Sequence, residues 1–304
     1  MKFGGKRESR LDLVRKDTFV GFAFISPSVL VIILFIIVPA AMSVHYCLTD
    51  WNGVASTYNY VGLQNFKNVI NAAEFPRIVS NTLFLVVLYV PVLNIVSILF
   101  AVTLFDIGKL SSFYKVVMYL PNILSSVVAG VIWRMIYNPV IGPLAQMLKA
   151  FGLSHLMQDL IGQSSTVMYA LSVGILWYAT GFYTLIYMGG LSGIPIDIYE
   201  AADIDGINSF QKLIYITIPM LMPSITINMV LATIAVITGF ELQLVLTEGG
   251  PGYSSLTMAL KAYFLAFREQ RLGMSMALSV MITIISVTVS LIMLNTLRKR
   301  EVEN

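Results

Sequence analysis

The sequence has few charged residues, one cysteine and two histidines. Only 12% of its 304 residues are Asp, Glu, Lys or Arg and 57% are hydrophobic, whereas an ordinary soluble domain has roughly 25% charged residues. Cys47 has no second cysteine for an internal disulfide, and His45 and His155 are too far apart in sequence to indicate a metal site by spacing. These shortages argue against a water-soluble protein and give no support to redox or metal chemistry.

The basic residues are gathered at the two ends of the chain and do not form a stripe interleaved with aromatic residues. Such a stripe is what nucleic-acid binding requires, so we expect no nucleic-acid partner. The formal net charge of +3 is also small for this length. We interpret the terminal charges as topology signals.

Long hydrophobic runs predict transmembrane helices. A bilayer core of about 30 Å needs about 20 apolar residues in a helix. Six stretches without Asp, Glu, Lys or Arg reach or nearly reach this length: Thr18–Thr49, Ile78–Phe105, Val116–Trp133, Leu160–Ile196, Leu213–Phe240 and Leu272–Leu297. We therefore expect an all-α polytopic membrane protein with six transmembrane helices. The apolar piece Met135–Leu148 is too short to span and contains Pro and Gly, so we expect an interfacial or re-entrant segment there.

Six spans place both ends of the chain on the same side of the membrane. Nine basic residues flank the first and last spans: Lys2, Lys6, Arg7, Arg10, Arg15, Lys16, Arg298, Lys299 and Arg300. The positive-inside rule then places both termini in the cytoplasm. A basic start followed by an apolar run also fits a cleaved signal peptide, but the run is much longer than the roughly 7–15 residues of a signal peptide core. We expect it to stay as the first helix.

These assignments divide the chain into five regions. They are a cytoplasmic basic tail (1–17), a first transmembrane helix (18–46), an extracytoplasmic loop (47–76), a five-helix transmembrane core (77–297) with a cytoplasmic loop at 195–222, and a cytoplasmic tail (298–304). The outer segments Cys47–Arg77 and Arg134–Asp159 are long enough to fold over the outer mouth.

The loop between the fourth and fifth predicted spans has the features of a short, exposed cytoplasmic helix. Pro195 blocks continuation of the preceding span, Asp197 with Glu200 resembles a capping box, and Gly206 supplies a stop. A second run then leads back to the membrane, where two prolines, Pro219 and Pro223, bracket the start of the next span. Such a loop is suited to contact with a cytoplasmic partner.

The spacing of residues in this loop resembles the cytoplasmic EAA loop of bacterial ABC importer permeases. That pattern is Glu-Ala-Ala, three residues, Gly, nine residues, Ile, one residue, Leu-Pro. The matching positions are Glu200, Ala201, Ala202, Gly206, Ile216 and Pro219, with Ile218 where the family usually has Leu. The resemblance implies that the loop, including Asp205, forms the coupling helix that sits in a groove of an ATPase subunit. The alternative is an ordinary capped cytoplasmic helix.

Further segments resemble the sugar importer permeases related to the maltose, lactose and glycerol-phosphate permeases. They are Leu246–Pro251, Tyr263–Ser279, Trp51–Gly53 and Val61–Phe66. The resemblance covers nearly the whole chain and implies the type I ABC importer permease fold in a bacterial cytoplasmic (inner) membrane. It also implies a second permease subunit, two ATPase subunits and an extracytoplasmic solute-binding protein.

The chain contains no Gly-x4-Gly-Lys-Ser/Thr loop that could hold ATP phosphates. We therefore expect a permease subunit that is not itself an enzyme and binds no cofactor. ATP and Mg²⁺ would be bound by the partner ATPase subunits.

Polar groups within the predicted spans are candidates for the substrate path, because they are costly in lipid and tend to face water or another helix. They are Tyr178, Tyr183 and Tyr187 in the fourth span and Asn228, Thr238, Glu241 and Gln243 in or just after the fifth. In related permeases the sugar is contacted from the span end before the Gly-Gly-Pro turn, which favours Thr238, Glu241 and Gln243. The alternative is that these groups bond neighbouring helices or belong to the aromatic belt.

The function that these observations favour is import of a sugar or sugar-like solute, an oligosaccharide, a monosaccharide or glycerol phosphate, with energy from separate ATPase subunits. The main alternative is a secondary transporter, in which Glu241 would carry protons or help to hold sodium. A membrane enzyme or a bare channel fits less well, because no paired carboxylates or Ser/His spacing recur and a channel needs no ATPase loop.

Overall fold

The computed structural model describes residues 24–106, 111–153 and 159–301. The predicted basic tail at 1–17, residues 18–23 of the predicted first span and residues 302–304 of the predicted C-terminal tail lie outside the described residues. Within the described part the regular structure is helical, apart from an isolated bridge between Thr49 and Tyr60. The predicted all-α fold class is confirmed.

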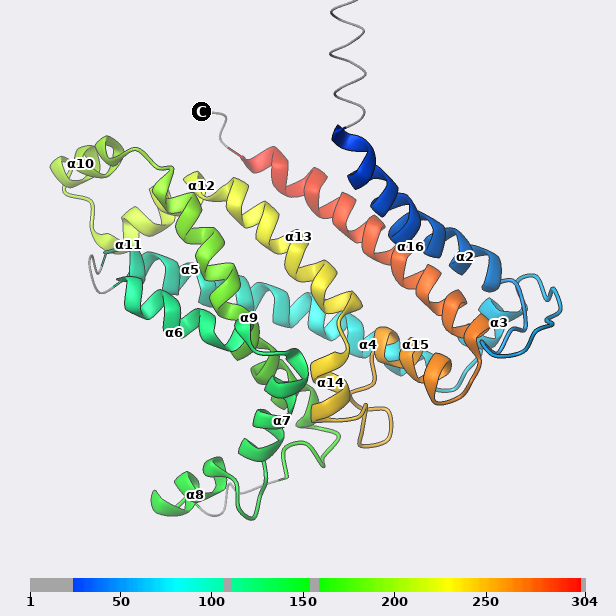
Figure 1. Ribbon diagram of the computed structural model, residues 1–304. Helices are drawn as coiled ribbons and strands as arrows, with labels where there is room; N and C mark the ends of the chain where they lie inside the picture. The colour runs from blue at the N-terminus through cyan, green and yellow to red at the C-terminus, as the bar shows by residue number, and fades with distance from the viewer. Residues whose placement is uncertain (1–23, 107–110, 154–158, 302–304) are drawn as a thin grey trace, which may run out of the picture.

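The helical elements follow one another along the chain as shown in Figure 1. In order they are η1 (Ile33–Ile37), α2 (Val38–Tyr46), α3 (Gln64–Ile70), α4 (Phe75–Phe84), η2 (Leu85–Tyr89), α5 (Val90–Asp106), α6 (Ser111–Ile123), α7 (Ser126–Ile136), α8 (Pro143–Ala150), α9 (Val167–Ser192), α10 (Ile196–Ile204), α11 (Ser209–Lys212), η5 (Leu213–Thr217), α12 (Ile218–Met220), α13 (Met222–Thr238), α14 (Glu241–Leu246), α15 (Met258–Phe267), α16 (Leu272–Leu297) and η6 (Arg298–Arg300).

Four continuous helices among the described residues are long and apolar enough to cross a bilayer. They are Phe24–Tyr46, Phe75–Phe105, Val167–Ser192 and Leu272–Leu297. They correspond to the first, second, fourth and sixth predicted spans, and the last has the predicted bounds. Two further pairs of helices, each bent at a short break, correspond to the third and fifth predicted spans, so the described residues contain up to six spans.

The third predicted span, Val116–Trp133, is not one helix. The chain turns by 96° between Ser112–Ile123 and Ser126–Ile136. Ser125 adopts an extended conformation and its side chain accepts a bond from the Val127 N–H, so it starts a new helix as an N-cap residue. The absence of charge over 116–133 predicted a span here but did not reveal the break within it.

The fifth predicted span, Leu213–Phe240, is also divided. The helical run Ser209–Met220 meets Met222–Thr238 at an angle of 72°. The bend lies between the two prolines that were predicted to bracket the start of the span, and Pro223 stands in the first turn of α13, where its missing N–H leaves no bond unmade.

Three buried clusters hold the helices together. The first centres on Tyr89, Leu171 and Leu246, the second on Ile78, Leu260 and Leu278, and the third on Ala101, Tyr187 and Leu221. Helix α9 packs against both α5 and α6, and a Cβ at Gly181 of α9 would overlap the Met118 carbonyl of α6. Small residues thus allow the close helix crossings expected in a membrane protein.

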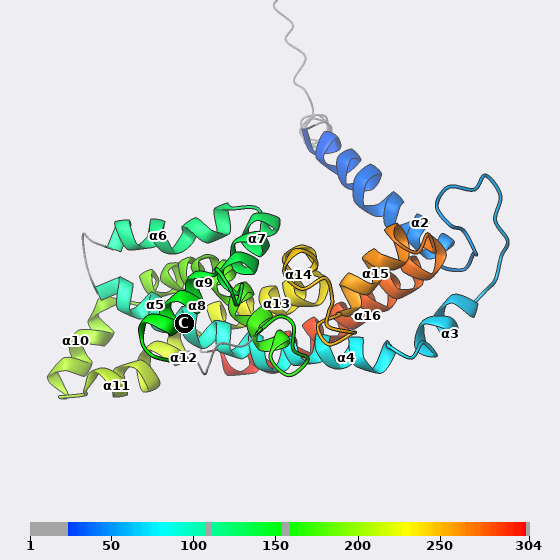
Figure 2. The same ribbon diagram turned by 90° about the horizontal axis from the view of Figure 1, so that it is seen from below.

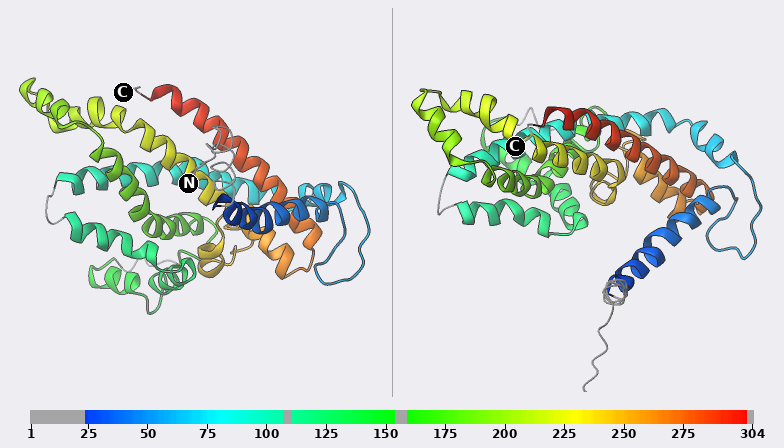
Figure 3. Two further views of the ribbon diagram at one scale, coloured as in Figure 1. Left: turned by 45° about the horizontal axis from the view of Figure 1, so that its top comes forward. Right: turned by 90° about the horizontal axis from the view of Figure 1, so that it is seen from above.

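The molecule has two distinct ends. Figure 1 places α10, α11 and the end of α16 at one end and α8, α14 and α15 at the other. The first long helix packs against α16 but diverges from the rest of the bundle, as Figure 2 shows from below. None of its most apolar 18-residue window is buried. In both panels of Figure 3, α10 and α11 project beyond the bundle.

The predicted outer segment 47–76 is attached to the start of α16. The Gly273 N–H donates to the Trp51 carbonyl at 2.8 Å. The buried Asn65 amide donates to the carbonyls of Cys47 and Thr49 at 2.9 and 2.7 Å. These bonds fix the end of the first helix beside α16.

Candidate functional site

The projecting loop begins with α10, which starts directly after the α9 span. Pro195 is the N-cap residue, with φ −59° and ψ 133° and no side-chain cap bond. The predicted capping box of Asp197 and Glu200 is therefore wrong, because a proline without a hydrogen-bonding side chain occupies the capping position. Asp197 instead lies in the first turn, where its charge favours the positive end of the helix dipole.

Gly206 ends α10, as predicted. Its φ is +73°, in the left-handed region that favours glycine. The Ile207 N–H donates to the Ala202 carbonyl and the Gly206 N–H to the Asp203 carbonyl, each at 3.1 Å. This pair of bonds is the Schellman motif, which satisfies carbonyls at the helix end.

One face of α10 is held against the protein and the other is free. Ala202 is only 4% exposed, and the Tyr199 hydroxyl lies 3.1 Å from the Thr217 hydroxyl of η5. An ion pair joins Asp203 to Lys212 of α11. The helix is thus connected to the segment that leads into α13.

The exposed face of α10 combines acidic and large apolar side chains. Glu200, Ala201, Asp205 and Gly206 are exposed, and so are Ile196 and Ile204, at 68% and 87%. Of the predicted coupling residues on this helix and its cap, Ala202 alone faces inward. This face of α10 is thus largely uncovered by the rest of the described chain at Ile196 and Ile204.

The segment between α10 and α13 is also held by hydrogen bonds and packing. Asn208 and Gln211 form a reciprocal capping box at the start of α11, with bonds of 2.9 and 3.1 Å. Pro219, the last of the predicted coupling residues, stands in α12 just before the 72° bend. Leu221 at the bend is 1% exposed and belongs to the third core cluster. The Tyr199–Thr217 contact and the Asp203–Lys212 ion pair thus connect α10 to the run that ends at this packed bend.

A cavity of about 480 Å³ lies between the helices that follow and precede this loop. Its size is within the range of roughly 300–1,000 Å³ typical of small-molecule sites. It is lined by Leu85, Tyr89, Leu93, Asn122, Ser126, Ile175, Tyr178, Ala179, Phe182, Tyr183, Ala232, Ala235, Val236, Gly239, Phe240, Glu241, Leu242 and Gln243. Both α9 and α13 form its walls.

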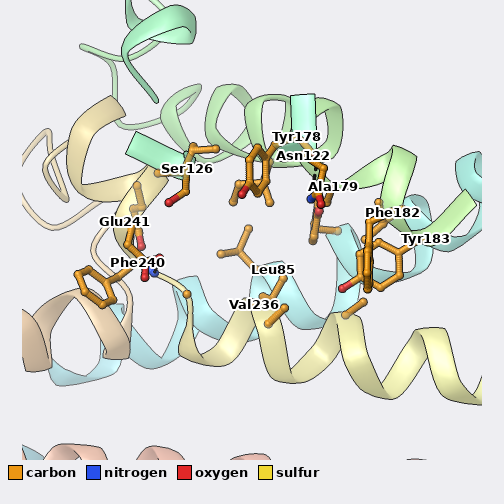
Figure 4. Close-up of a pocket in the computed structure, with 18 residues that line it drawn as sticks. Leu85, Asn122, Ser126, Tyr178, Ala179, Phe182, Tyr183, Val236, Phe240 and Glu241 are labelled. Carbon is orange, nitrogen blue, oxygen red and sulfur yellow. Dashed lines mark hydrogen bonds between the residues drawn. The ribbon is translucent and has the colours of Figure 1, made fainter. Parts of the chain in front are cut away.

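Figure 4 shows how the polar and aromatic groups are arranged around this cavity. Ser126, Tyr178 and Asn122 lie along one side, with Leu85 and Val236 opposite them. Phe240 and Glu241 lie at one end, and Phe182 and Tyr183 at the other. Aromatic faces with a few convergent polar groups are suited to a polyhydroxylated solute.

Three of the seven predicted substrate-path residues have side chains suited to contact a solute in the cavity. They are Tyr178, Tyr183 and Glu241. Gln243 also lines it, but its amide is used elsewhere: its nitrogen donates to the Ser255 carbonyl and its oxygen accepts from the Thr257 hydroxyl. The structure thus gives Gln243 a role in fixing the turn after α14.

The other three predicted residues lie outside the cavity. Asn228 is fully buried and donates to the Tyr183 carbonyl at 3.1 Å. The Thr238 hydroxyl donates to the Ile234 carbonyl of its own helix, and its side chain lines a separate pocket beside α15 and α16. Tyr187 is buried and donates to Asn94 at 2.5 Å. These contacts fit the alternative interpretation, in which polar groups within the spans bond a neighbouring helix or their own helix. It applies to Asn228, Thr238 and Tyr187.

Sequence reasoning missed several lining residues. Asn122 and Ser126 come from the two sides of the break between α6 and α7, and Phe182 and Phe240 supply further aromatic faces. Tyr89 is 3% exposed and its hydroxyl has no hydrogen-bond partner among the described residues. The sequence did contain a signal for Asn122 and Ser126. The pairs Pro121-Asn122 and Ser125-Ser126 interrupt an otherwise apolar run.

A buried polar network fixes the Gly-Gly-Pro turn beside the cavity. The Asn81 amide of α4 donates to the carbonyls of Tyr253 and Leu256, at 2.9 and 2.8 Å. The Ser255 hydroxyl donates to the Gly250 carbonyl at 2.7 Å. The turn is thus attached to the second span, which positions α14 and Glu241.

An ion-paired cluster lies near the same end of the molecule, around a second cavity of about 380 Å³. Lys261 of α15 contacts Glu74 at 2.9 Å and Glu269 at 2.8 Å. The hydrogen bond from Lys261 lowers the pKa of Glu74. Burial opposes the charge of Lys261, but its bonds to the two carboxylates raise its pKa overall. This cluster joins the start of the second span to α15.

The described residues contain no group of three or more His, Cys, Asp or Glu side chains that could hold a metal ion.

Comparisons with known proteins agree with this architecture. Residues 70–301 match the family described as binding-protein-dependent transport system inner membrane component. The chain is 27% identical to the diacetylchitobiose uptake system permease protein NgcF of Streptomyces coelicolor, over 93% of this chain and 83% of that protein. It is 27% identical to the trehalose/maltose transport system permease protein MalF of Thermococcus litoralis, over 90% and 92%.

A solved structure has the same fold. A chain of a bacterial alginate ABC transporter, crystallised in complex with an alginate pentasaccharide-bound periplasmic protein, superposes with a TM-score of 0.83 at 19% identity and covers 96% of this chain and 98% of that one. The likeness confirms the predicted ABC importer permease fold.

Proposed function

Because the chain belongs to the family of binding-protein-dependent transport system inner membrane components, we propose that it is a membrane-spanning permease subunit of an ATP-driven sugar importer. The two relatives described above carry sugar uptake in their names. The cavity supports the same substrate class, because its aromatic faces and hydroxyl and amide groups match the surfaces of a sugar.

The observation that carries the proposal is the exposed helix α10, which stands between the two spans that wall the cavity. Pro195 joins it directly to the end of α9, and the Tyr199–Thr217 contact joins it to the run that leads into α13. A partner that moves α10 would therefore move α9 and α13 relative to each other. This is the connection that an external ATPase requires to open and close the cavity.

The proposed permease function also implies the partners of this subunit. Two ATPase subunits bind ATP and Mg²⁺, and one of them contacts the exposed face formed by Glu200, Ala201, Asp205 and Gly206. A second permease subunit completes the cavity. An extracytoplasmic binding protein delivers the solute, as the periplasmic protein in the alginate transporter structure supports.

In the proposed orientation, α10 and both termini face the cytoplasm of a bacterial cell. Two features support it. The end of α16 lies at the same end of the molecule as α10, and the exposed Arg298 and Lys299 follow it.

Transport proceeds by alternating access. Closure of the ATPase dimer displaces α10, and the displacement reaches the cavity through α9 on one side and through the bend at Leu221 on the other. The 72° bend matters because it converts motion along the membrane surface into motion of α13.

A matched pair of glycine variants tests the coupling role. Gly206→Ala and Gly152→Ala change glycines with almost the same φ, +73° and +72°, and a Cβ meets no atom within 4 Å at either site. Each variant therefore suffers only the strain of a left-handed alanine, roughly 1–2 kcal/mol. We expect Gly206→Ala, and likewise Glu200→Gln, to reduce solute uptake and solute-stimulated ATP hydrolysis in the assembled transporter, while Gly152→Ala leaves both near wild type.

If uptake and ATP hydrolysis in Gly206→Ala and Glu200→Gln match those of Gly152→Ala, α10 is not the coupling element. A second measurement addresses the energy source. Uptake that persists without ATP and collapses with the proton gradient would show a secondary transporter instead.

A further inference from the structure

We propose that the imported solute carries no negative charge, being a neutral or amino sugar, and that Glu241 is the residue of this chain that enforces this selectivity. The inference rests on the proposed function and narrows its substrate class. It depends on the charged residues in the cavity lining, on the hydrogen bond that the Glu241 carboxylate accepts, and on its having no Lys or Arg partner among the described residues.

Glu241 presents a free carboxylate to the cavity. It is the first residue of α14, is exposed, and lies at one end of the cavity beside Phe240. Its one hydrogen bond within the described chain is from the Phe240 N–H, at 3.3 Å. By contrast, the carboxylates of Glu74, Glu248 and Glu269, near the same end of the molecule, each contact a Lys or Arg. The charge of Glu241 is thus left for the solute.

The rest of the lining does not offset this charge. Among the described residues that line the cavity, Glu241 is the only one with a charged side chain, and none is Lys or Arg. Sites that bind carboxylates or phosphates usually present Arg or Lys, or free backbone N–H groups. One backbone group at this end of the cavity, the Phe240 N–H, already donates to the Glu241 carboxylate.

The remaining polar groups match hydroxyl or amine groups of a solute. A carboxylate only accepts hydrogen bonds, so Glu241 pairs with sugar hydroxyls or with an ammonium group. A uronate or phosphate would instead place a second negative charge near Glu241.

The expected discrimination is large. Two carboxylates about 5 Å apart, at an effective dielectric constant of about 20, repel strongly enough to weaken binding by on the order of 100-fold. Fold similarity does not contradict this. The alginate transporter, whose solute is a polyuronate, shares the fold at 19% identity, and charge selectivity depends on individual side chains.

The test compares matched sugars on the assembled transporter in lipid nanodiscs. The probes are maltose, trehalose, cellobiose and diacetylchitobiose as neutral disaccharides, the chitosan disaccharide as an amino sugar, and digalacturonate as an acidic one. Solute-induced stabilisation without the binding protein reports on the permease cavity itself. Uptake with the binding protein, in proteoliposomes, reports on transport.

We expect the wild type to bind a neutral or amino disaccharide on the order of 100-fold more tightly than digalacturonate. Glu241→Gln should bring digalacturonate close to the neutral sugars, and Glu241→Lys should reverse the order. Glu248→Gln is the matched control: it removes a carboxylate seven residues further along, outside the cavity lining, and should keep the wild-type order.

The outcomes separate the two claims. Wild-type binding or uptake of digalacturonate equal to that of the neutral sugars overturns the charge inference and leaves the sugar importer standing. An order that is the same in wild type and Glu241→Gln also overturns it. If no sugar of the panel is bound or transported, the proposed sugar function itself fails, and the inference fails with it.

Discussion

The short helices α8 and α10 lie at opposite ends of the molecule and end in the same way. Each is followed by a glycine in the left-handed region, and each is closed by the same two backbone bonds, to Leu148 and Lys149 in α8 and to Ala202 and Asp203 in α10. Each also exposes large apolar side chains, Met147 and Phe151 on one and Ile196 and Ile204 on the other.

The two helices differ in what they are connected to. α10 follows Pro195 at the end of α9 and contacts the run into α13 through Tyr199 and the Asp203–Lys212 ion pair. α8 is flanked by turn residues on both sides, and the hydrogen bond of its Gln146 side chain is local, to the Ile141 carbonyl. The local structure of the two helices is therefore shared, whereas the side-chain bonds to the run that leads into α13 belong to α10.

The most severe test of this difference is to overfill the buried face of each helix. Ala202 in α10 and Ala145 in α8 are 4% and 6% exposed, so a leucine at either position costs about 1–3 kcal/mol in steric strain. We expect Ala202→Leu to displace α10 and so to lower uptake per folded complex at least about tenfold. A tenfold loss corresponds to a free-energy cost of about 1.4 kcal/mol. Ala145→Leu should leave uptake per folded complex near wild type.

Uptake and solute-stimulated ATP hydrolysis would be measured in proteoliposomes, with the amount of folded complex determined by size-exclusion chromatography. An equal loss of uptake in both variants would show that the two helices do not differ in function.

A second prediction concerns the end of the molecule that holds α15. Glu74→Gln removes one of the two carboxylates on Lys261, which is 14% exposed at its side chain, and should lower the stability of the complex by about 1.5–3 kcal/mol at neutral pH. Because the folded pKa of Glu74 is below its ordinary value, its stabilisation is complete above that ordinary value, about 4.3. It is lost as the pH falls through the folded pKa.

Thermal unfolding of the complex measured between about pH 7 and pH 3 should therefore show a smaller acid-induced loss in Glu74→Gln than in wild type. Coupled ATP hydrolysis at neutral pH should change little, because the ion-paired cluster lies at the opposite end from α10. A full acid-induced loss in the variant would mean that Glu74 does not carry this stabilisation.

A smaller effect is expected from the exposed ion pair that tethers α10. Asp203→Lys places two positive charges together, and Lys212→Asp places two negative ones. Exposed pairs contribute about 0.2–1 kcal/mol, and a like-charge pair is destabilising by a similar amount. Each single variant loses the attraction and gains the repulsion, so uptake should fall by a few-fold. The double variant Asp203→Lys/Lys212→Asp restores the attraction and should recover most of the loss, and high salt should reduce all three differences. Failure of the double variant to recover would exclude a tethering role.

The smallest effect is expected from two single hydrogen bonds. Tyr199→Phe removes the 3.1 Å contact with Thr217, and Gln146→Ala removes the 3.0 Å bond to the Ile141 carbonyl beside α8. Each bond contributes about 0.5–1.5 kcal/mol. Only Tyr199→Phe should raise the ATP hydrolysed per solute imported, because a weaker connection between α10 and η5 transmits less of each ATPase cycle to the cavity. A similar rise in Gln146→Ala would remove the distinction between α8 and α10.

Much of the fold was predictable from the long stretches that contain no Asp, Glu, Lys or Arg. The run Leu272–Leu297 is one helix with those bounds, and the four continuous spans all fall on predicted runs. The breaks were not predictable in this way. Residues 116–133 contain no charge, yet Ser125 caps a new helix within them, because a break depends on backbone conformation and local capping bonds.

The candidate site was only partly predictable, for a different reason. The spacing of Glu200 to Gly206 identified the exposed helix, since that pattern is local. Polarity alone could not separate Glu241, which faces the cavity, from Gln243, whose amide is occupied by Ser255 and Thr257. Those partners come from another part of the chain, and their positions are known only from the three-dimensional structure.

The attachment of the first helix at one end has a mechanical consequence. Its C-terminal end is fixed beside α16 by the Gly273 N–H and the Asn65 amide, while the remainder diverges from the bundle. Its 23 residues make a lever arm about 35 Å long, at about 1.5 Å per residue. A rotation of about 10° at the fixed end would displace the far tip by about 6 Å over that length. Small rearrangements beside the start of α16 would thus be amplified at the other end of this helix.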